Sequence, residues 1–191
     1  MSEERRKVKR WEENNIPQEI MSPPIGVGFK FIPQKDKKAK KVPVNVATGG
    51  NAKSNDPKTW RPLGEVIARA VALGLDAIGF AITKPIIGID IDGCVASGVI
   101  ASYARKIISA LDSYTEFSPS GTGIHILCKG ELPSDRKFSE LGVEMYSGGR
   151  FFTITGDIVP GCKRTIEARK DELLKLFEEL KLAEEEKKSV R

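Results

Sequence analysis

An isoleucine-rich run that ends in two aspartates constrains this chain more than any other feature. The run is Ile86-Ile87-Gly88-Ile89-Asp90-Ile91-Asp92-Gly93. Its β-branched side chains favour an extended strand because they pack well on a pleated surface. Side chains two residues apart in a strand share a face, so Asp90 and Asp92 should project side by side, and Gly93 permits an immediate turn. Adjacent carboxylates repel each other unless a cation lies between them, and hard divalent ions prefer such oxygen ligands.

The composition is that of a globular chain of 191 residues with a net charge of +5, long enough for one sizeable domain. Its apolar stretches are far shorter than the ~20 residues that cross a bilayer, and the charged N-terminus does not resemble a signal peptide. We therefore expect a cytoplasmic protein with no membrane partner. One histidine and three widely spaced cysteines argue against a structural zinc site and favour buried free thiols; the cysteines are Cys94, Cys128 and Cys162.

The pattern along the chain predicts three parts. We expect residues 1–25 to form a charged arm or helix and residues 26–164 to form the main domain, which carries the candidate site of chemistry. Residues 165–191 are expected to form a charged helix that begins at Thr165 and is a possible linker to a missing module. Strands are expected at 26–33, 77–82, 86–92, 124–128, 143–146 and 150–155, with a helix at 98–112. We expect hairpins to join 77–82 to 86–92 and 143–146 to 150–155. Strands outnumber helices, so the fold class is α+β with a largely antiparallel sheet.

Lysine and arginine gather in two segments, near the N-terminus and between residues 30 and 41. The second segment is expected to be a lysine-rich loop between two strands. Such runs are either solvated surface or contacts to a polyanion, and composition alone leaves both possibilities open.

Three further residues are candidates for chemistry, each with a structural alternative. His125 follows the loop Ser118-Pro-Ser-Gly-Thr-Gly123, whose N–H and hydroxyl groups suit phosphate oxygens, although turns use the same residues. Glu144 offers a third carboxylate on a strand or is a surface glutamate. Arg150 opens the next strand and suits either a bidentate phosphate contact or a salt bridge to a neighbouring acid.

The combined order of these motifs is more specific than any part. D-x-D, then S-x-S-G-x-G-x-H, then E-x-Y…R-F-x-T-x-T-G resembles the primase-polymerase domain of phage and plasmid replication proteins, in the archaeo-eukaryotic primase superfamily. The resemblance covers roughly residues 26–160 and includes Lys41-x-Pro43 and Asp56-Pro57…Trp60. It implies an RRM-like, mostly antiparallel catalytic sheet with a small N-terminal α/β module.

The resemblance also implies a role for each candidate residue. Asp90, Asp92 and Glu144 match the acidic positions that bind metal and are catalytic. The nucleotide-binding positions are His125, Ser118, Ser120, Gly121 and Arg150, with Lys41 as a nucleotide or template contact. Two divalent ions, Mg²⁺ or Mn²⁺, would assist attack of a 3′-hydroxyl on the α-phosphate of a nucleoside triphosphate. The implied partners are dNTPs or NTPs, a single-stranded DNA template and primer, and a helicase or accessory priming module.

Two other functions remain compatible with parts of the sequence. A catalytically silent nucleic-acid-binding domain would keep the basic surface but would not need the paired carboxylates. A metal-dependent nuclease would use the acids but has no evident need for the loop before His125. A nicking initiator with a His-hydrophobe-His metal site is excluded because the chain has one histidine.

Overall fold

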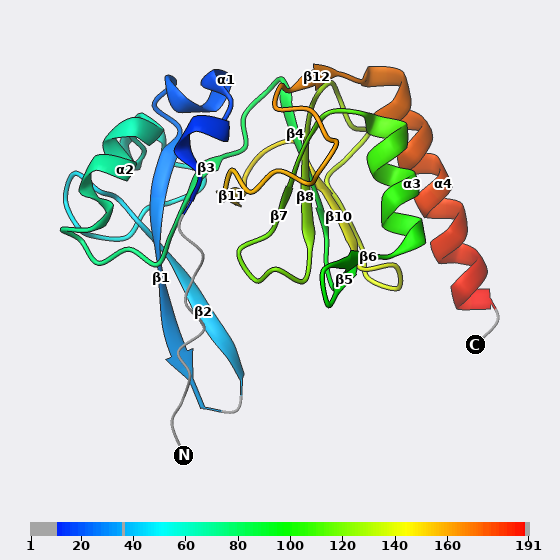
Figure 1. Ribbon diagram of the computed structural model, residues 1–191, viewed down its shortest axis with the longest axis horizontal. Coiled ribbons are helices and arrows are strands. Elements are labelled where there is room, and N and C mark those ends of the chain that lie inside the picture. The colour runs from blue at the N-terminus through cyan, green and yellow to red at the C-terminus, as the bar shows by residue number, and fades with distance from the viewer. Residues whose placement is uncertain (1–10, 36, 190–191) are drawn as a thin grey trace.

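The computed structural model describes residues 11–35 and 37–189, and it is an α+β fold built on two main sheets. Figure 1 shows two modules side by side, with the first sheet on the left and the second on the right. The strands are mostly antiparallel, as the sequence predicts; β12 pairs with β8 in parallel. Among the described residues, none of the helices combines the length and apolar character needed to cross a bilayer.

The first module is a four-stranded sheet in the order β11-β3-β1-β2, covered by short helices. Its strands are β1 (Gly26–Gln34), β2 (Lys37–Val44), β3 (Ala77–Ala81) and β11 (Phe151–Ile154), and its α-helices are α1 (Gln18–Met21) and α2 (Leu63–Ala70). Two 3-10 turns, at Glu13–Asn15 and Pro57–Thr59, complete it. The helix α2 turns Leu63, Val66 and Ala70 into the core, a spacing typical of one helix face.

The second module is a sheet in the order β12-β8-β4-β10-β9, with β7 also paired to β8. Its strands are β4 (Ile86–Ile91), β7 (Tyr114–Phe117), β8 (Ile124–Lys129), β9 (Arg136–Phe138), β10 (Val143–Tyr146) and β12 (Glu167–Ala168). Two helices, α3 (Ser102–Leu111) and α4 (Lys170–Ser189), cover the side that faces away from the first module (Figure 1).

The alternation of β4 decides which face of the second sheet is free for chemistry. Ile87, Ile89 and Ile91 are buried in the core against α3 and α4. Ile86, Gly88 and Asp90 therefore lie on the opposite face, toward the first module. A Cβ at Gly88 would lie 2.7 Å from Ile82 Cδ1 and 3.2 Å from the ring of Phe152, so glycine permits the close approach of the two modules there.

Two predicted hairpins are wrong. The strands β3 and β4 are consecutive in the chain, but β3 pairs with β1 and β11 in the first sheet, and β4 pairs with β8 and β10 in the second. Likewise β10 belongs to the second sheet and β11 to the first. Both short connections carry the chain from one sheet to the other. The short turns between these strands suggested hairpins, but strand pairing is decided by the long-range burial of each strand's apolar face.

Three element boundaries also differ from the predictions. The lysine-rich segment is not a loop, because β2 begins at Lys37 and pairs with β1 to form a projecting hairpin (Figure 1). The helix predicted at 98–112 begins only at Ser102, because β5 (Val95–Ala96) and β6 (Val99–Ile100) form a small hairpin around Ser97-Gly98. The final helix begins at Lys170 rather than Thr165, since β12 precedes it.

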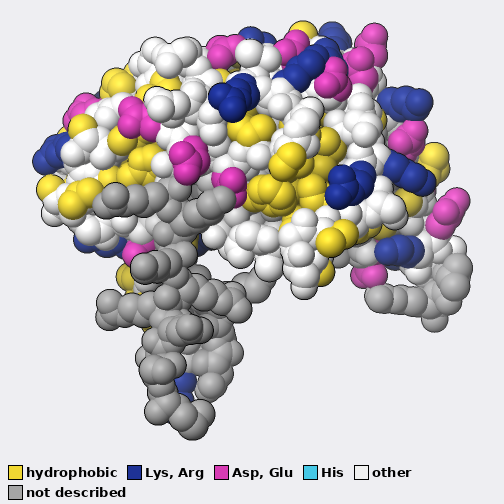
Figure 2. Space-filling view, viewed as in Figure 1, with side chains coloured by type: hydrophobic (Ala, Val, Ile, Leu, Met, Phe, Trp, Pro, Cys, Tyr) yellow, Lys and Arg dark blue, Asp and Glu magenta, His cyan; other side chains and the backbone are white. Residues whose placement is uncertain are grey.

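The two ends of the described chain pack into the cores. Residues 1–10 of the predicted arm lie outside the described residues, whereas Ile16, Ile20 and Ile25 are buried with the first sheet. In α4 one stripe is buried against the second sheet, namely Leu173, Leu176, Phe177 and Leu180. Most of the other residues of that helix are charged. Figure 2 shows lysine, arginine and acidic side chains interspersed over the right-hand edge of the molecule. The division into three parts stays a prediction.

Candidate active site

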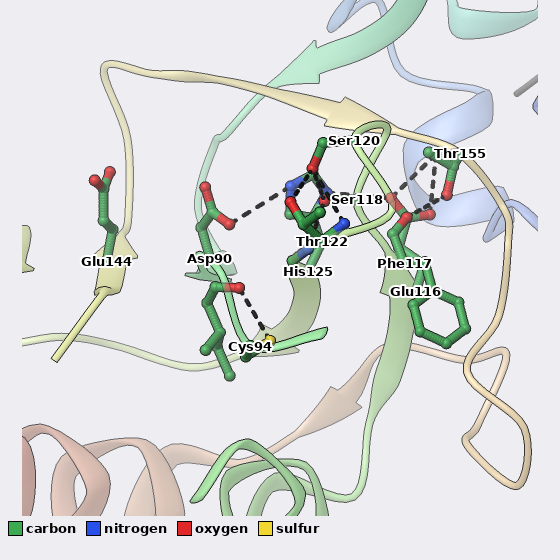
Figure 3. A network of polar contacts seen from close by, with 12 residues as sticks. Asp90, Cys94, Glu116, Phe117, Ser118, Ser120, Thr122, His125, Glu144 and Thr155 are labelled. Atoms are coloured by element: carbon green, nitrogen blue, oxygen red, sulfur yellow. Dashed lines mark hydrogen bonds and ion pairs between the residues drawn. The ribbon is translucent and has the colours of Figure 1, made fainter. Parts of the chain in front are cut away.

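A row of five polar side chains crosses the second sheet from strand to strand. The register pairs Lys137 of β9 with Glu144 of β10, then Asp90 of β4, His125 of β8 and Glu116 of β7. Residues directly opposite one another in a sheet point to the same face. All five therefore lie on the face away from α3 and α4, and Figure 3 shows Glu144, Asp90, His125 and Glu116 in this sequence.

Asp90 and Asp92 stand at the end of β4, as the sequence predicts. Asp90 is the penultimate residue of the strand, and Asp92 begins the turn, where its N–H donates to Gly142 O at 2.8 Å. The Asp90 side chain is 26% exposed. Burial raises the pKa of Asp90, and the negative charges of Asp92 and Glu144 raise it further, against the opposing effect of His125 and Lys41. Negative charge at this point is therefore only partly compensated by the protein.

The two aspartates fit a hard cation, and the third carboxylate is engaged elsewhere. Within the described part of the chain, the Asp92 carboxylate has no hydrogen bond or ion pair, and that of Asp90 has only the long contact to His125. A divalent ion would relieve the repulsion that raises the Asp90 pKa. Among residues 11–35 and 37–189, however, no three acidic, histidine or cysteine side chains converge as a ready metal site. The role of Glu144 as a metal ligand stays a prediction.

Glu144 is held by two neighbours on its own side of the sheet. Lys137 forms an ion pair with Glu144 Oε1, and Tyr146 Oη donates to Oε2 at 2.6 Å. Burial alone would raise the pKa of Glu144, but these two hydrogen bonds outweigh burial and hold it below its usual value. Burial and the same carboxylate raise the pKa of Tyr146 to about 12. Glu144 is therefore ionised beside Asp90 but neutralised by Lys137.

His125 lies beside Asp90 and below the hydroxyl-rich loop. Its Nε2 is 3.8 Å from Asp90 Oδ1, and only 5% of the residue is exposed. In the loop, Ser118 Oγ and Ser120 Oγ are 3.0 Å apart, and Gly121 N–H donates to Ser118 O at 2.8 Å. The loop is tied to the segment after Asp92 because Val95 N–H donates to Thr122 O at 3.0 Å. Figure 3 shows the loop side chains grouped next to His125.

The predicted basic residues approach the same region. The guanidinium of Arg150 stacks on the Tyr146 ring, with its Cζ 5.2 Å from the centroid, and its charge helps to lower the pKa of Glu144. Lys41 projects from β2 with its Nζ 6.0 Å from the Phe31 ring, and its charge acts on Asp90. The structure therefore brings Asp90, Asp92, Glu144, His125 and Arg150 together, with Lys41 at the edge of the group.

Comparison with known proteins finds a relevant similarity, to a phage primase-polymerase. No family model matches the chain. The chain is 37% identical over 130 residues to the DNA Primase-polymerase of Nitratiruptor phage NrS-1. The resemblance to a primase-polymerase domain is confirmed. The match covers 63% of this chain but only 18% of the phage protein, so it concerns a domain of that larger primase-polymerase.

Sequence reasoning missed two residues of the row, Lys137 and Glu116. Glu116 lies on β7, is fully buried, and its Oε1 is 3.2 Å from His125 Nδ1. The sequence of the segment Tyr114-Thr-Glu-Phe117 predicts a short extended piece and gives Glu116 no role. The one available signal was its place in the strand before the loop that leads to His125, which makes the two residues cross-strand neighbours.

Proposed function

We propose that this chain is the catalytic domain of a DNA-dependent primase-polymerase with an archaeo-eukaryotic primase fold. It would transfer nucleotides from nucleoside triphosphates to a 3′-hydroxyl on a single-stranded DNA template, in phage or plasmid replication. The observation that carries the proposal is the row in which Asp90 lies between Glu144 and His125 on the sheet face opposite α3 and α4. The similarity to the phage DNA Primase-polymerase supports the same chemistry.

The carboxylates are assigned to metal binding. Asp90 and Asp92 would hold Mg²⁺ or Mn²⁺, and Glu144 would join them if Lys137 released it. When bound, two such ions supply activation of the attacking oxygen and stabilisation of the leaving one. The protein contributes by keeping negative charge concentrated at the end of β4, where burial has already removed part of its water.

The neighbouring polar groups are assigned to the triphosphate. His125 presents Nε2 beside Asp90, and the guanidinium of Arg150 lies over Tyr146, so both can reach an anion bound above the row. The loop with Ser118, Ser120 and Gly121 supplies hydroxyl and N–H donors next to them. Holding the phosphate chain in line for attack accounts for much of the catalysis in phosphoryl and nucleotidyl transfer.

The β1–β2 hairpin is assigned to the single-stranded template or primer. Lys30, Lys35, Lys40 and Lys41 are exposed on it, and Ile32 is 50% exposed. Phe31 lies opposite Lys41, so one face of the hairpin combines an aromatic ring with a positive charge. This combination is typical of surfaces that bind single strands, because lysines contact phosphates and flat or apolar side chains contact bases.

We also propose a helicase or an accessory priming module as a partner of this domain.

Primer extension on single-stranded DNA with Mg²⁺ or Mn²⁺ tests the proposal, together with unprimed synthesis and a nuclease assay on the same template. Asp90→Ala with Asp92→Ala should abolish extension, whereas Asp112→Asn should leave it intact. Asp112 is an exposed aspartate on the far side of the sheet whose left-handed backbone suits asparagine. Nuclease activity that disappears in the double variant, without any synthesis, would favour a nuclease. Synthesis unchanged by the double variant would contradict the proposal.

A further inference from the structure

Glu116 is a buried carboxylate for which the proposed chemistry has no direct use. It lies on β7, its exposed fraction is 0%, and it is separated from Asp90 by His125 in the cross-strand row. A carboxylate is costly to bury unless hydrogen bonds replace its water. Its partners therefore indicate what it does in this fold.

Three groups besides histidine donate to Glu116. Tyr114 Oη donates to Oε2 at 2.6 Å, Thr155 N–H lies 3.0 Å from each oxygen, and Gly156 N–H donates to Oε2 at 2.8 Å. Both carboxylate oxygens therefore accept hydrogen bonds from backbone N–H groups. Three donor groups are directed at the carboxylate, which assigns it as an acceptor, so we expect a further partner to donate to it.

The backbone that supplies these donors is itself fixed. Thr155 Oγ1 donates to Phe117 O at 2.8 Å, which ties the segment after β11 to β7. Gly156 has a φ of +68°, and a Cβ there would lie 2.2 Å from Glu12 O. Only glycine fits this conformation and this close approach, so the chain turns both N–H groups toward Glu116. Three groups other than His125 therefore hold the Glu116 carboxylate in place.

His125 supplies the remaining contact. Its Nδ1 is 3.2 Å from Glu116 Oε1, and its ring lies against Phe152 with centroids 4.6 Å apart. The opposite ring nitrogen, Nε2, faces Asp90 (Figure 3). Because the groups around Glu116 are donors, we assign Glu116 as the acceptor of this contact and place a hydrogen on Nδ1. The hydrogen bond at Nδ1 then sets both the ring orientation and what Nε2 presents to the site.

We propose that Glu116 is a positioning residue that holds a hydrogen on His125 Nδ1 and so aims Nε2 into the active site beside Asp90. The part of this inference that concerns a triphosphate at Nε2 rests on the proposed function. The part that concerns the histidine ring does not, and it can be tested on the protein alone. Outer carboxylates that orient a histidine commonly change activity by about 10-fold to 100-fold when replaced.

The histidine ring can be observed directly because His125 is the one histidine of the chain. Long-range ¹H–¹⁵N spectra of protein labelled in histidine show which ring nitrogen carries hydrogen. We expect a hydrogen on Nδ1 in the wild type and in Tyr114→Phe, which removes one donor to Glu116 but leaves the contact to the ring. In Glu116→Gln, a tautomer of His125 without a hydrogen on Nδ1 should appear. A wild type with bare Nδ1, or a Glu116→Gln spectrum identical to the wild type, would overturn the inference.

Kinetics separate a positioning role from a general structural one. Glu116→Gln should lower kcat/KM for the nucleotide by about 10-fold to 100-fold. In a His125→Ala background, the same change should add less than about 2-fold, because Glu116 acts through the ring. A full additional loss in that background would overturn the inference. If Glu116→Gln fails to fold, the wild-type spectrum alone shows whether Nδ1 carries a hydrogen. If the protein shows no synthesis at all, the spectra still test the contact between Glu116 and His125.

Discussion

Glu144 lies directly opposite Asp90 on the neighbouring antiparallel strand, and both side chains share the free face of the second sheet. Like charges in this position destabilise a sheet unless a positive charge intervenes. Lys137, opposite Glu144 on the other side, supplies that charge in the protein alone. Under the proposed function, a metal ion bound at Asp90 would compete with Lys137 for the Glu144 carboxylate.

This competition predicts a gain of function. Lys137→Met should free Glu144 and increase the affinity for Mn²⁺ by about 3-fold to 10-fold, the range expected for an ion pair of ~1 kcal/mol. Calorimetric titration with Mn²⁺ measures the effect. The matched control is Lys170→Met, which breaks the surface pair with Glu131 outside the site. An affinity unchanged in Lys137→Met would indicate that Glu144 is not a metal ligand.

A second prediction concerns the stability of the metal-free protein. The pKa of Asp90 is raised in the folded state, so its ionisation opposes folding, and this penalty develops as pH rises above the ordinary aspartate value of ~3.9. Asp90→Asn should therefore raise Tm at pH 7 by about 2–4 °C without metal, as ~1 kcal/mol does in a chain of this size. The gain should shrink toward pH 4. Thermal unfolding followed by circular dichroism measures it, and a lower Tm at pH 7 would show that Asp90 is stabilising.

The proposed nucleic-acid surface predicts a change in salt dependence. Replacing Lys40 and Lys41 with alanine should weaken binding of single-stranded DNA and reduce the slope of log K against log salt by about 0.7 for each phosphate that is no longer neutralised. Fluorescence anisotropy with a labelled oligonucleotide at several salt concentrations measures both quantities. Alanine at Lys175 and Lys181, on the exposed side of α4, should leave the slope unchanged. Equal effects of the two pairs would mean that only net charge matters.

A buried glutamate adds an ion pair between α4 and β9. Glu184 is 3% exposed and contacts Arg136 at 3.1 Å and Lys188 at 3.3 Å. Burial would raise its pKa, but these two partners together lower it. A lowered pKa stabilises the fold above the unfolded-state value of ~4.3, and this stabilisation is lost as pH falls through the folded-state value.

Glu184→Gln should therefore cost about 1 kcal/mol at pH 7, and the difference between wild type and variant should shrink as pH falls toward 3. Urea unfolding at the two pH values measures the difference. Glu179→Gln, on an exposed turn of the same helix, is the control and should have little effect. A difference that persists undiminished at pH 3 would exclude the charge as its cause.

Sequence reasoning succeeded where one local pattern decides the structure. The alternation and β-branching around Ile89 predicted β4, and similar patterns predicted β1, β3 and β8. It failed at strand pairing, because the short links after β3 and β10 resemble hairpin turns while each strand's partner lies far away in the chain. It also placed the start of α3 too early, since the two-residue turn at Ser97-Gly98 is easily absorbed into a helical pattern.

The sequence also indicated some parts of the candidate site and not others. Asp90 and His125 are adjacent because their strands pair in register, and Asp92 follows at the end of β4. The order of motifs was enough to suggest this grouping. The ion pair that occupies Glu144 depends on Lys137 of β9, a strand the sequence did not predict. Glu116 was missed because its burial depends on N–H groups about 40 residues away, at Thr155 and Gly156. Such long-range hydrogen bonds leave no local pattern.

The aspartate pair at the end of β4 is the group to which we assign nucleotidyl transfer. Addition of one labelled nucleotide to a primer on single-stranded DNA, followed at early times in Mn²⁺, tests this assignment most directly. We expect incorporation by the wild type and by Asp112→Asn, and a loss of at least about 100-fold in Asp90→Asn and in Asp92→Asn, each with its fold intact. Incorporation at the wild-type rate by either folded active-site variant would contradict the account.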